Sequence, residues 1–317
     1  MNKELILGID TSNYTTSIAI MSAEGELIAN LKRPLPVKAG ERGLRQSDAV
    51  FAHTVNIPSL MNEARKYLDG AKVLCVGVSE KPRNQEGSYM PCFLTGVAAA
   101  ESISSVMGIP LYRFSHQCGH IMAALYSSGR ADLLDKEFAA FHISGGTTEL
   151  VRVIPNDKGF RAELLGGTAD LNAGQIIDRI GVYAGLKFPC GPALELEALK
   201  NDAKIPRKKI SSKGMTVNLS GLENMAIKLY NDTQNLPMTA AFVFDYVGRS
   251  ISSMMSAYEE VYGKTTFVMA GGVMCNSLIK KMLSESYSVA FAEPALSCDN
   301  AVGIAALALR AHKTEKN

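Results

Sequence analysis

The stretches Gly8-Ile9-Asp10-Thr11-Ser12 and Ile143-Ser144-Gly145-Gly146-Thr147 lie at corresponding places in the two halves of this 317-residue chain. Each stretch begins at the end of an apolar, strand-like segment and brings glycine and hydroxyl side chains into the loop that follows. In both halves two more strand-like segments come next, and then helical and strand-like segments alternate. A repeated order of this kind predicts an internal duplication, with two α/β domains of similar topology around a cleft.

The apolar periodicity of the chain defines the elements expected on either side of these loops. In the first half, strands are expected at 4–10, 15–21, 26–33, 73–78 and 110–114, and helices at 48–68 and 93–107. In the second half, strands are expected at 137–143, 149–154, 160–165, 265–270 and 287–292, and helices at 172–185, 221–233, 238–261, 276–284 and 299–311. We therefore expect domains at residues 1–130 and 131–317, with the last helix able to pack back on the first domain.

Length and composition narrow the class of protein. One hydrophobic core rarely serves more than about 250–300 residues, so a chain of 317 residues favours two domains. The 33 basic and 31 acidic residues give a net charge of +2, which excludes a strongly basic nucleic-acid coat but allows a local basic patch. No apolar run reaches the roughly 18 residues of a membrane span and no signal peptide is evident, so we expect a cytoplasmic protein that does not contact membranes.

Two of the five histidines, His116 and His120, are four residues apart in a segment that Ser115 can cap as a helix. Positions i and i+4 share one helix face, so both imidazoles can reach a single metal ion such as Fe or Zn. Asp299, just before the last expected helix, is a candidate third ligand, although an N-cap role explains it equally well. The alternative for the pair is a solvated helix face. Gln117 stands where a zinc protease has its glutamate, which disfavours a metallopeptidase.

Glycine-rich and hydroxyl-rich loops follow several of the expected strands. Gly271 and Gly272 join a strand to a helix, where a ligand can approach the backbone and the helix N-terminus favours negative charge. The Ser144–Thr148 loop can offer backbone N–H groups to an anion. The Asp10 carboxylate in the partner loop is suited to Mg²⁺ or an ordered water. The alternative for each loop is an ordinary tight turn.

Two polar features of the second half are candidate contacts to a nucleotide or a nucleic acid. Asp178 lies on an expected helix and can accept hydrogen bonds from ribose hydroxyls, and the alternative is a surface ion pair with Arg179 or Lys187. The segment 200–213 carries six positive residues against one acid, Asp202, and can meet phosphate groups. The alternative for this segment is a solvated loop, because it contains no aromatic residue for stacking.

Taken together and in this order, the motifs resemble the TsaD family, also called the Gcp or glycoprotease-like family, of the actin-like ATPase superfamily. The resemblance covers about residues 5–310. His116 and His120 match the family's H-x-x-G-H motif, and Ser144–Gly146 matches its S-G-G motif. Asp178 corresponds to the acid of A-G-E-A-F-D-K, and Gly191 lies in the segment that resembles the Y-P-G-G-P turn. Gly271–Asn276 matches G-G-V-x-x-N, and Asp299 corresponds to the acid of T-D-N-A. It implies the duplicated α/β fold of actin, sugar kinases and heat-shock chaperones.

The resemblance also implies an activity, which is the transfer of a threonylcarbamoyl group from threonylcarbamoyl-adenylate to N6 of adenosine 37 in tRNA. It assigns Asp10 and Ser144 to catalysis and His116, His120 and Asp299 to a divalent metal, Fe or Zn. The remaining positions would bind ATP, AMP or an acyl-adenylate, together with Mg²⁺, and they are Ser12, Gly145, Gly146, Thr147, Asp178, Gly191, Gly271, Gly272 and Asn276. The implied partners are tRNA, at the basic segment 200–213, and proteins of the TsaB or TsaE kind or a paralogous chain in a heterodimer.

The chain departs from the family pattern at several positions, which keeps other functions open. Tyr14-Thr15 replaces an acidic pair, Lys81-Pro82-Arg83-Asn84 replaces G-P-G-L, and Thr147 and Gln175 replace a histidine and a glutamate. These departures are typical of a divergent paralogue. The alternatives are therefore another carbamoyl or acyl transferase and a non-catalytic, nucleotide-binding partner of a true family member. Cys118 and Cys298 lie beside the expected metal site, and we expect them to be spectators, with a softer ligand set as the alternative.

Overall fold

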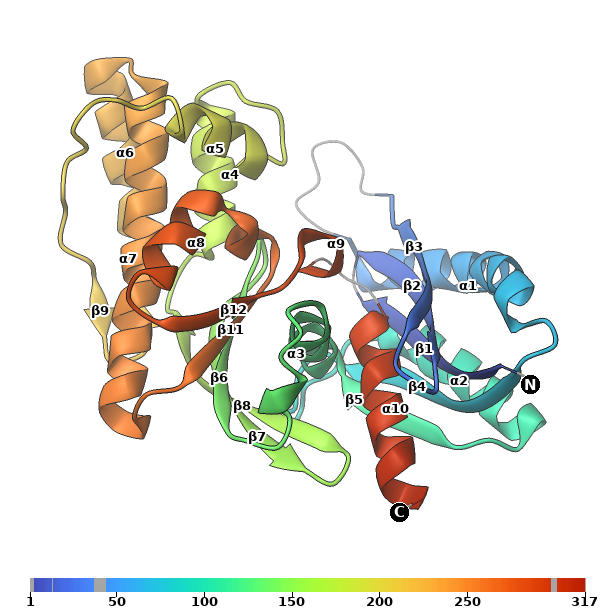
Figure 1. Ribbon diagram of the computed structural model, residues 1–317. Helices are drawn as coiled ribbons and strands as arrows, with labels where there is room; N and C mark the ends of the chain where they lie inside the picture. The colour runs from blue at the N-terminus through green and yellow to red at the C-terminus, as the bar shows by residue number, and fades with distance from the viewer. Residues whose placement is uncertain (1–2, 13, 37–43, 298–300, 317) are drawn as a thin grey trace. The chain divides into compact units, whose positions relative to one another are not determined.

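The chain folds into two compact units, each built around one β-sheet with helices packed against it (Figure 1). The computed structural model describes residues 3–12, 14–36, 44–297 and 301–316. Unit 1 comprises residues 1–137, 153–163 and 295–317, and unit 2 comprises residues 138–152 and 164–294. This division differs from the expected domains at 1–130 and 131–317, because a hairpin tip at 153–163 and the C-terminal segment belong to unit 1.

Unit 1 contains a five-stranded sheet in the order β3-β2-β1-β4-β5. Strand β1 pairs antiparallel with β2 and parallel with β4. Both β1 and β4 are apolar on their two faces and almost entirely buried, as expected of strands that are covered from both sides. The strands are β1 (Glu4–Ser12), β2 (Thr15–Ser22), β3 (Leu27–Pro34), β4 (Lys72–Lys81) and β5 (Leu111–Ser115).

Helices cover the sheet of unit 1 on opposite faces. Side chains alternate along a strand, so Leu7 and Ile9 of β1 point into the core shared with α1 and α2, whereas Gly8 faces α10. Helix α3 packs against α10. The helices are α1 (Gln46–Leu68), α2 (Phe93–Met107), α3 (His116–Ser127), the short η1 (Ala131–Leu133) and α10 (Val302–Lys316). The short α9 (Pro294–Ser297) lies where the chain returns to unit 1.

Unit 2 contains a seven-stranded sheet in the order β12-β11-β6-β7-β8-β10-β9. The strands are β6 (Phe138–Ile143), β7 (Thr148–Asn156), β8 (Gly159–Thr168), β9 (Ser212–Lys213), β10 (Thr216–Val217), β11 (Thr266–Ala270) and β12 (Ser288–Phe291). Its helices are α4 (Ala173–Tyr183), α5 (Gly191–Ala198), α6 (Ser220–Thr233), α7 (Leu236–Tyr262), η2 (Gly272–Cys275) and α8 (Ser277–Ser284). None of the helices within the described ranges is long and apolar enough to cross a membrane.

The two sheets have the same topology, which confirms the predicted duplication. In unit 1 the five strands are arranged third, second, first, fourth, fifth by their order in the chain. In unit 2 the strands β6, β7, β8, β11 and β12 are arranged in the same way, and β10 and β9 extend the edge beyond β8. The strands β9 and β10, of two residues each, are too short to leave a periodic pattern, and the residues of α5 show no amphipathic periodicity. The sequence therefore did not predict these three elements.

Helix α10 approaches its neighbours in unit 1 so closely that glycine is required at the contacts. A Cβ atom at Gly303 would lie 1.8 Å from the carbonyl oxygen of Gly119 in α3. Cβ atoms at Gly8 and Gly77 would lie 2.7 and 2.8 Å from the carbonyl oxygens of Ala301 and Ile304. The last helix therefore rests directly on the backbones of β1, β4 and α3.

We predict that Gly303→Ala lowers the stability of the chain by about 3 kcal/mol or more, because an added methyl group has no room against backbone atoms. The matched control is Gly221→Ala on α6, where a Cβ would meet no atom within 4 Å. That change should leave stability unchanged or raise it by up to about 1 kcal/mol, because alanine favours a helix over glycine. Urea denaturation followed by circular dichroism measures both, and a wild-type midpoint for Gly303→Ala would contradict the close contact between α3 and α10.

Candidate functional site

A buried carboxylate lies where β1 and β4 end in unit 1. Parallel strands end at the same edge of a sheet, and here that edge brings Asp10, Ser12 and Ser79 together. Asp10 is fully buried. Its Oδ1 accepts hydrogen bonds from the Ser79 hydroxyl and from His116 Nδ1 at 2.9 Å, and its Oδ2 accepts one from the Ser12 N–H at 3.3 Å. The protein itself thus supplies donors to both oxygens, which compensates the burial of this charge.

The two histidines expected to bind a metal face each other on α3. Ser115 caps the helix by accepting a hydrogen bond from the Cys118 N–H at 3.2 Å, and His116 is the first helical residue. The Nε2 atoms of His116 and His120 are 3.0 Å apart, and their ring planes are inclined by 77°. Because an ionised carboxylate only accepts, His116 Nδ1 donates to Asp10, which leaves Nε2 as the ring atom that can coordinate a metal.

This geometry fits two ligands of one metal ion. Two nitrogen donors at about 2.1 Å from a metal are roughly 3.0 to 3.4 Å apart when the angle between them runs from a right angle to the tetrahedral angle. Within the described ranges no group of three or more His, Cys, Asp or Glu side chains is arranged to hold a metal ion. Asp299, the expected third ligand, lies outside the described residues.

The Cys118 thiol, expected beside the metal site, forms a hydrogen bond with Asn84. Burial raises its pKa to about 11, so it stays protonated at neutral pH. The S–H group donates to Asn84 Oδ1 at 2.9 Å. A protonated thiol that is engaged in this way is consistent with a spectator. Cys298 lies outside the described residues.

In unit 2 the Ser144–Thr147 loop forms a tight turn on top of α4. The Ser144 N–H donates to the Thr147 carbonyl at 2.8 Å, and the Gly146 N–H donates to Ser144 Oγ at 3.3 Å. A Cβ at Gly174 would lie 2.6 Å from the Ser144 carbonyl oxygen, so α4 supports the turn only if residue 174 is glycine. Gly174 belongs to the same sequence motif as Asp178, but the sequence alone assigns it no role.

The glycines expected to contact a nucleotide are of two kinds. Gly271 has φ +97°, and a Cβ there would lie 2.3 Å from the Ile143 carbonyl oxygen, so the fold itself requires this glycine. A Cβ at Gly145, Gly146 or Gly272 would meet no atom of the described residues within 4 Å, and none of these three adopts the left-handed backbone. Packing within the described part of the chain therefore does not explain them, whereas a ligand that lies against the backbone would.

Buried polar atoms without partners mark two of the expected nucleotide contacts. Asn276 caps α8, since its Oδ1 accepts the Ile279 N–H at 3.0 Å, but its buried Nδ2 finds no acceptor among the described residues. In unit 1 the buried Ser12 Oγ likewise has no partner in the described part of the chain. Because an unsatisfied buried polar group costs about 1–3 kcal/mol, these atoms are candidate contacts to a bound molecule.

The N-terminus of α8 is already occupied by a carboxylate of the protein. Glu195 Oε1 accepts the Ser277 N–H at 2.7 Å and the Ser277 hydroxyl at 2.5 Å. The sequence suggested that this helix end attracts a phosphate, but a second negative charge there would be repelled by Glu195. The arrangement suits a neutral part of a nucleotide, such as the ribose or the base, better than its phosphate. No sequence signal pointed to Glu195.

Asp178 holds the turn that leads into α5. Its Oδ1 accepts the Cys190 N–H at 2.7 Å. Burial raises the pKa of Asp178, and the Cys190 N–H partly offsets that rise. Arg179 pairs instead with Glu223 at 2.9 Å. One carboxylate oxygen of Asp178 therefore accepts the N–H of Cys190, the residue before Gly191. The second oxygen of this carboxylate is the one that a ligand could contact.

Asp170, which precedes α4, has a structural role. Its carboxylate accepts the Ser220 hydroxyl at 2.7 Å and the Leu219 N–H at 2.8 Å, at the start of α6. Burial alone would raise its pKa, but these hydrogen bonds, together with those from the N–H groups of Leu171 and Ser220, lower it to about 2. Asp170 thus ties α6 to the loop before α4.

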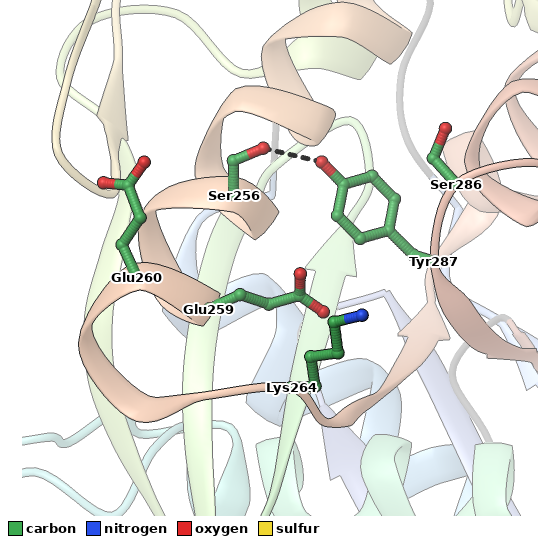
Figure 2. Close-up of a pocket in the computed structure, with 6 residues that line it drawn as sticks. All are labelled: Ser256, Glu259, Glu260, Lys264, Ser286 and Tyr287. Carbon is green, nitrogen blue, oxygen red and sulfur yellow. Dashed lines mark hydrogen bonds between the residues drawn. The ribbon is translucent and has the colours of Figure 1, made fainter.

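A separate surface pocket of about 480 Å³ lies at the C-terminal end of α7 (Figure 2). Two of its lining residues are joined by a 2.7 Å hydrogen bond between the Tyr287 and Ser256 hydroxyls. The remaining lining residues are Glu259, Glu260, Lys264 and Ser286. None of the site residues expected from the sequence lines this pocket.

We predict that Gly145→Ala and Gly272→Ala keep the wild-type stability but weaken AMP binding about 10-fold or more, because the added methyl groups fill the space a ligand would use. Isothermal titration calorimetry with AMP measures binding, and thermal unfolding measures stability. Gly221→Ala, where the added methyl group also meets no atom, serves as the control and should leave AMP binding unchanged without lowering stability. Unchanged AMP affinity in both site variants would show that these glycines do not line a nucleotide site.

Comparison with known proteins assigns the sequence to a family. The sequence profile of TsaD, described as tRNA N6-adenosine threonylcarbamoyltransferase, matches residues 38–306. The enzyme of that name from Christiangramia forsetii is 27% identical over 296 residues, covering 89% of this chain and 84% of the relative. The Streptococcus suis enzyme is 28% identical over 330 residues, covering 100% and 95%.

Solved structures with low sequence identity show the fold. HypF from T. kodakarensis superposes with a TM-score of 0.61 at 12% identity, covering 99% of this chain and 48% of that protein. The activator of 2-hydroxyisocaproyl-CoA dehydratase from Clostridium difficile, solved with ADPNP, superposes with a TM-score of 0.53 at 12% identity, covering 98% and 97%. These neighbours confirm the duplicated actin-like ATPase fold. Because the TsaD profile spans most of the sequence, the chain belongs to the tRNA N6-adenosine threonylcarbamoyltransferase family, which is a family of enzymes.

Proposed function

We propose that this chain is a metal-dependent transferase that moves a threonylcarbamoyl group from its adenylate to N6 of a tRNA adenosine. The observation that carries the proposal is the Asp10–His116–His120 arrangement, in which a buried carboxylate orients one of two facing imidazoles. Family membership supports the reaction class. Two alternatives are transfer to another acceptor and a non-catalytic role beside a true family member. The experiments below distinguish them from this proposal.

In unit 1 the proposed ligands are His116 and His120, with Asp299 as the third. A divalent metal, Fe or Zn, would supply Lewis-acid polarisation of an oxygen on the bound substrate. Asp10 keeps the Nδ1 proton of His116 in place and so leaves Nε2 as the donor atom, as a carboxylate behind a metal-binding histidine does. Because Asp10 is fully buried and both of its oxygens accept protein hydrogen bonds, we assign it to positioning rather than to acid–base chemistry or Mg²⁺ binding.

In unit 2 the proposed ligand is the adenosine part of ATP, AMP or the acyl-adenylate. The unpartnered Asn276 Nδ2 would donate to it, Gly272 would admit it against the backbone, and Asp178 would accept from the ribose beside Gly191. The Ser144–Thr147 turn, with Gly145 and Gly146 open to solvent, would receive the phosphate or the transferred group. Backbone N–H groups of such a turn that do not donate within it would stabilise negative charge that develops during transfer.

The basic segment 200–213 is the proposed contact to tRNA. Its backbone is fastened to α7, since Arg249 donates to the Lys208 carbonyl at 2.9 Å and the Tyr246 hydroxyl donates to the Lys209 carbonyl at 3.4 Å. The side chains of Arg207, Lys208 and Lys209 are exposed. A backbone held in place with its cations in solvent is suited to phosphate groups, because little ordering is needed on binding.

We also propose a protein partner, of the TsaB or TsaE kind or a paralogous chain. The support is an exposed apolar surface on α1 and α2, where Phe51, Val55 and Leu94 are 72%, 57% and 53% exposed. Exposed apolar residues gathered on neighbouring helices are typical of surfaces that bind other proteins.

We predict that His116→Ala reduces the Fe or Zn bound to the purified chain to background, because the one imidazole and one carboxylate that remain are a weak ligand set. Mass spectrometry of the metals in the purified protein gives the content. The control is His312→Gln, which removes the buried histidine of α10 and should leave the metal content unchanged. Metal retained in His116→Ala would refute the proposed site.

The wild-type gene should in addition rescue a strain that lacks tRNA threonylcarbamoylation. If rescue fails although the purified chain binds metal and AMP, the acceptor is not tRNA adenosine or the chain is not catalytic. Rescue by the wild type and its loss in His116→Ala would support the proposed reaction.

We predict that the double variant Lys208→Gln/Lys209→Gln binds tRNA more weakly and lowers the slope of log affinity against log salt by about 2, since each phosphate contact contributes about 1. Filter binding across a salt series gives the slope. The control is Lys313→Gln/Lys316→Gln at the exposed end of α10, which removes the same charge from unit 1. Equal slopes in the two double variants would show that segment 200–213 does not contact the phosphates.

A further inference from the structure

The loop Lys81-Pro82-Arg83-Asn84, where the sequence departs from the family pattern, lies against the first turn of α3. Three hydrogen bonds join the two: the Gln117 N–H donates to the Pro82 carbonyl at 3.0 Å, the Ser115 hydroxyl donates to Asn84 Oδ1 at 2.5 Å, and the Cys118 thiol donates to the same Oδ1 at 2.9 Å. The loop is therefore attached to the helix on both sides of His116.

These bonds satisfy groups that a helix cannot satisfy itself. The first backbone N–H groups of an α-helix have no partners within the helix. Here the loop carbonyl of Pro82 accepts from Gln117, and the Ser115 hydroxyl accepts from Cys118. A hydroxyl has a single proton to donate. Because the Ser115 hydroxyl donates it in a hydrogen bond to Asn84, a lone pair of Ser115 Oγ stays directed at the Cys118 N–H.

The orientation of His116 depends on this first turn. His116 is the first residue of α3, whereas His120 lies one turn further into the helix and is buried. If the first turn frayed, the His116 ring would move and the His120 ring would stay. The 3.0 Å separation of their Nε2 atoms requires that both backbone positions be held.

We propose that the Lys81–Asn84 loop, through the side-chain amide of Asn84, is the positioning element that keeps His116 aligned with His120. This inference rests on the proposed function, because it treats the two histidines as metal ligands. A loop that merely stabilised the fold would change the unfolding midpoint and leave metal binding unaltered. A positioning role changes the affinity and the geometry of the bound metal.

The experiment uses the full chain, freed of metal, with Co²⁺ as the probe, because Co²⁺ occupies such sites and its visible absorption reports coordination geometry. Partners in direct contact with a ligand contribute about 10–100-fold to metal affinity, and Asn84 acts one step further away. We expect Asn84→Ala to weaken Co²⁺ binding about 3–10-fold and to alter the spectrum. Asn84→Asp, which keeps an acceptor oxygen, should restore both.

The matched control is Asn156→Ala in the β7–β8 hairpin, where the asparagine Oδ1 also accepts a hydrogen bond, in this case from the Lys158 N–H at 3.0 Å. This change should leave Co²⁺ affinity and spectrum at wild-type values. Amide hydrogen exchange gives a readout without metal, and Gln117 and Cys118 should exchange faster in Asn84→Ala because their first turn opens more often.

The outcomes separate this inference from the proposed function. Wild-type Co²⁺ affinity and spectrum in Asn84→Ala, with binding lost in His116→Ala, would overturn the role of the loop and leave the metal pair standing. Undiminished Co²⁺ binding in His116→Ala would overturn the metal pair itself and the loop's role with it. Weaker binding in Asn84→Ala that Asn84→Asp restores would support the positioning role.

Discussion

The backbone contact between Gly119 of α3 and Gly303 of α10 is the constraint on which the rest of unit 1 depends. At this point the two helices leave no space for a side chain, since a Cβ at Gly303 would lie 1.8 Å from the Gly119 carbonyl oxygen. Because α10 also rests on β1 and β4 at Gly8 and Gly77, one helix from the end of the chain connects all three elements. Those elements carry Asp10 and the two histidines of the candidate site. The packing of α10 against them therefore holds the parts of this site together.

A second constraint is the buried charge of Asp10. A carboxylate removed from water is costly unless donors surround it, and here the donors come from β1, β4 and α3. The same hydrogen bonds that compensate the charge fix the tautomer of His116. One carboxylate thus meets a requirement of the fold, since its charge is compensated, and orients the ring of a proposed metal ligand.

The succession of strands and helices along the chain could be predicted, and so could the placement of His116 and His120 on one helix face, because both depend on local spacing. Alternation along strands and the i, i+4 relation on a helix are visible in one sequence. Polar contacts between distant segments leave no such pattern. Asn84 reaches Ser115 across 31 residues, and Glu195 reaches Ser277 across 82. For that reason only the structure reveals the contact of the Lys81–Asn84 loop with α3 and the Glu195 carboxylate at the start of α8. The resemblance alone assigns Asp10 to catalysis, and its hydrogen bonds point instead to positioning.

The departures from the family pattern can be understood by what each side chain contacts. Gln175 stands in for a glutamate, and its Oε1 accepts the Asn172 N–H at 3.1 Å in a capping box, which an amide completes as well as an acid does. Thr147 stands in for a histidine, but it enters the Ser144 turn through its carbonyl, a contact that any residue can make. The turn is thus independent of the side chain at 147. It depends instead on Gly174 beneath it, where no other residue fits.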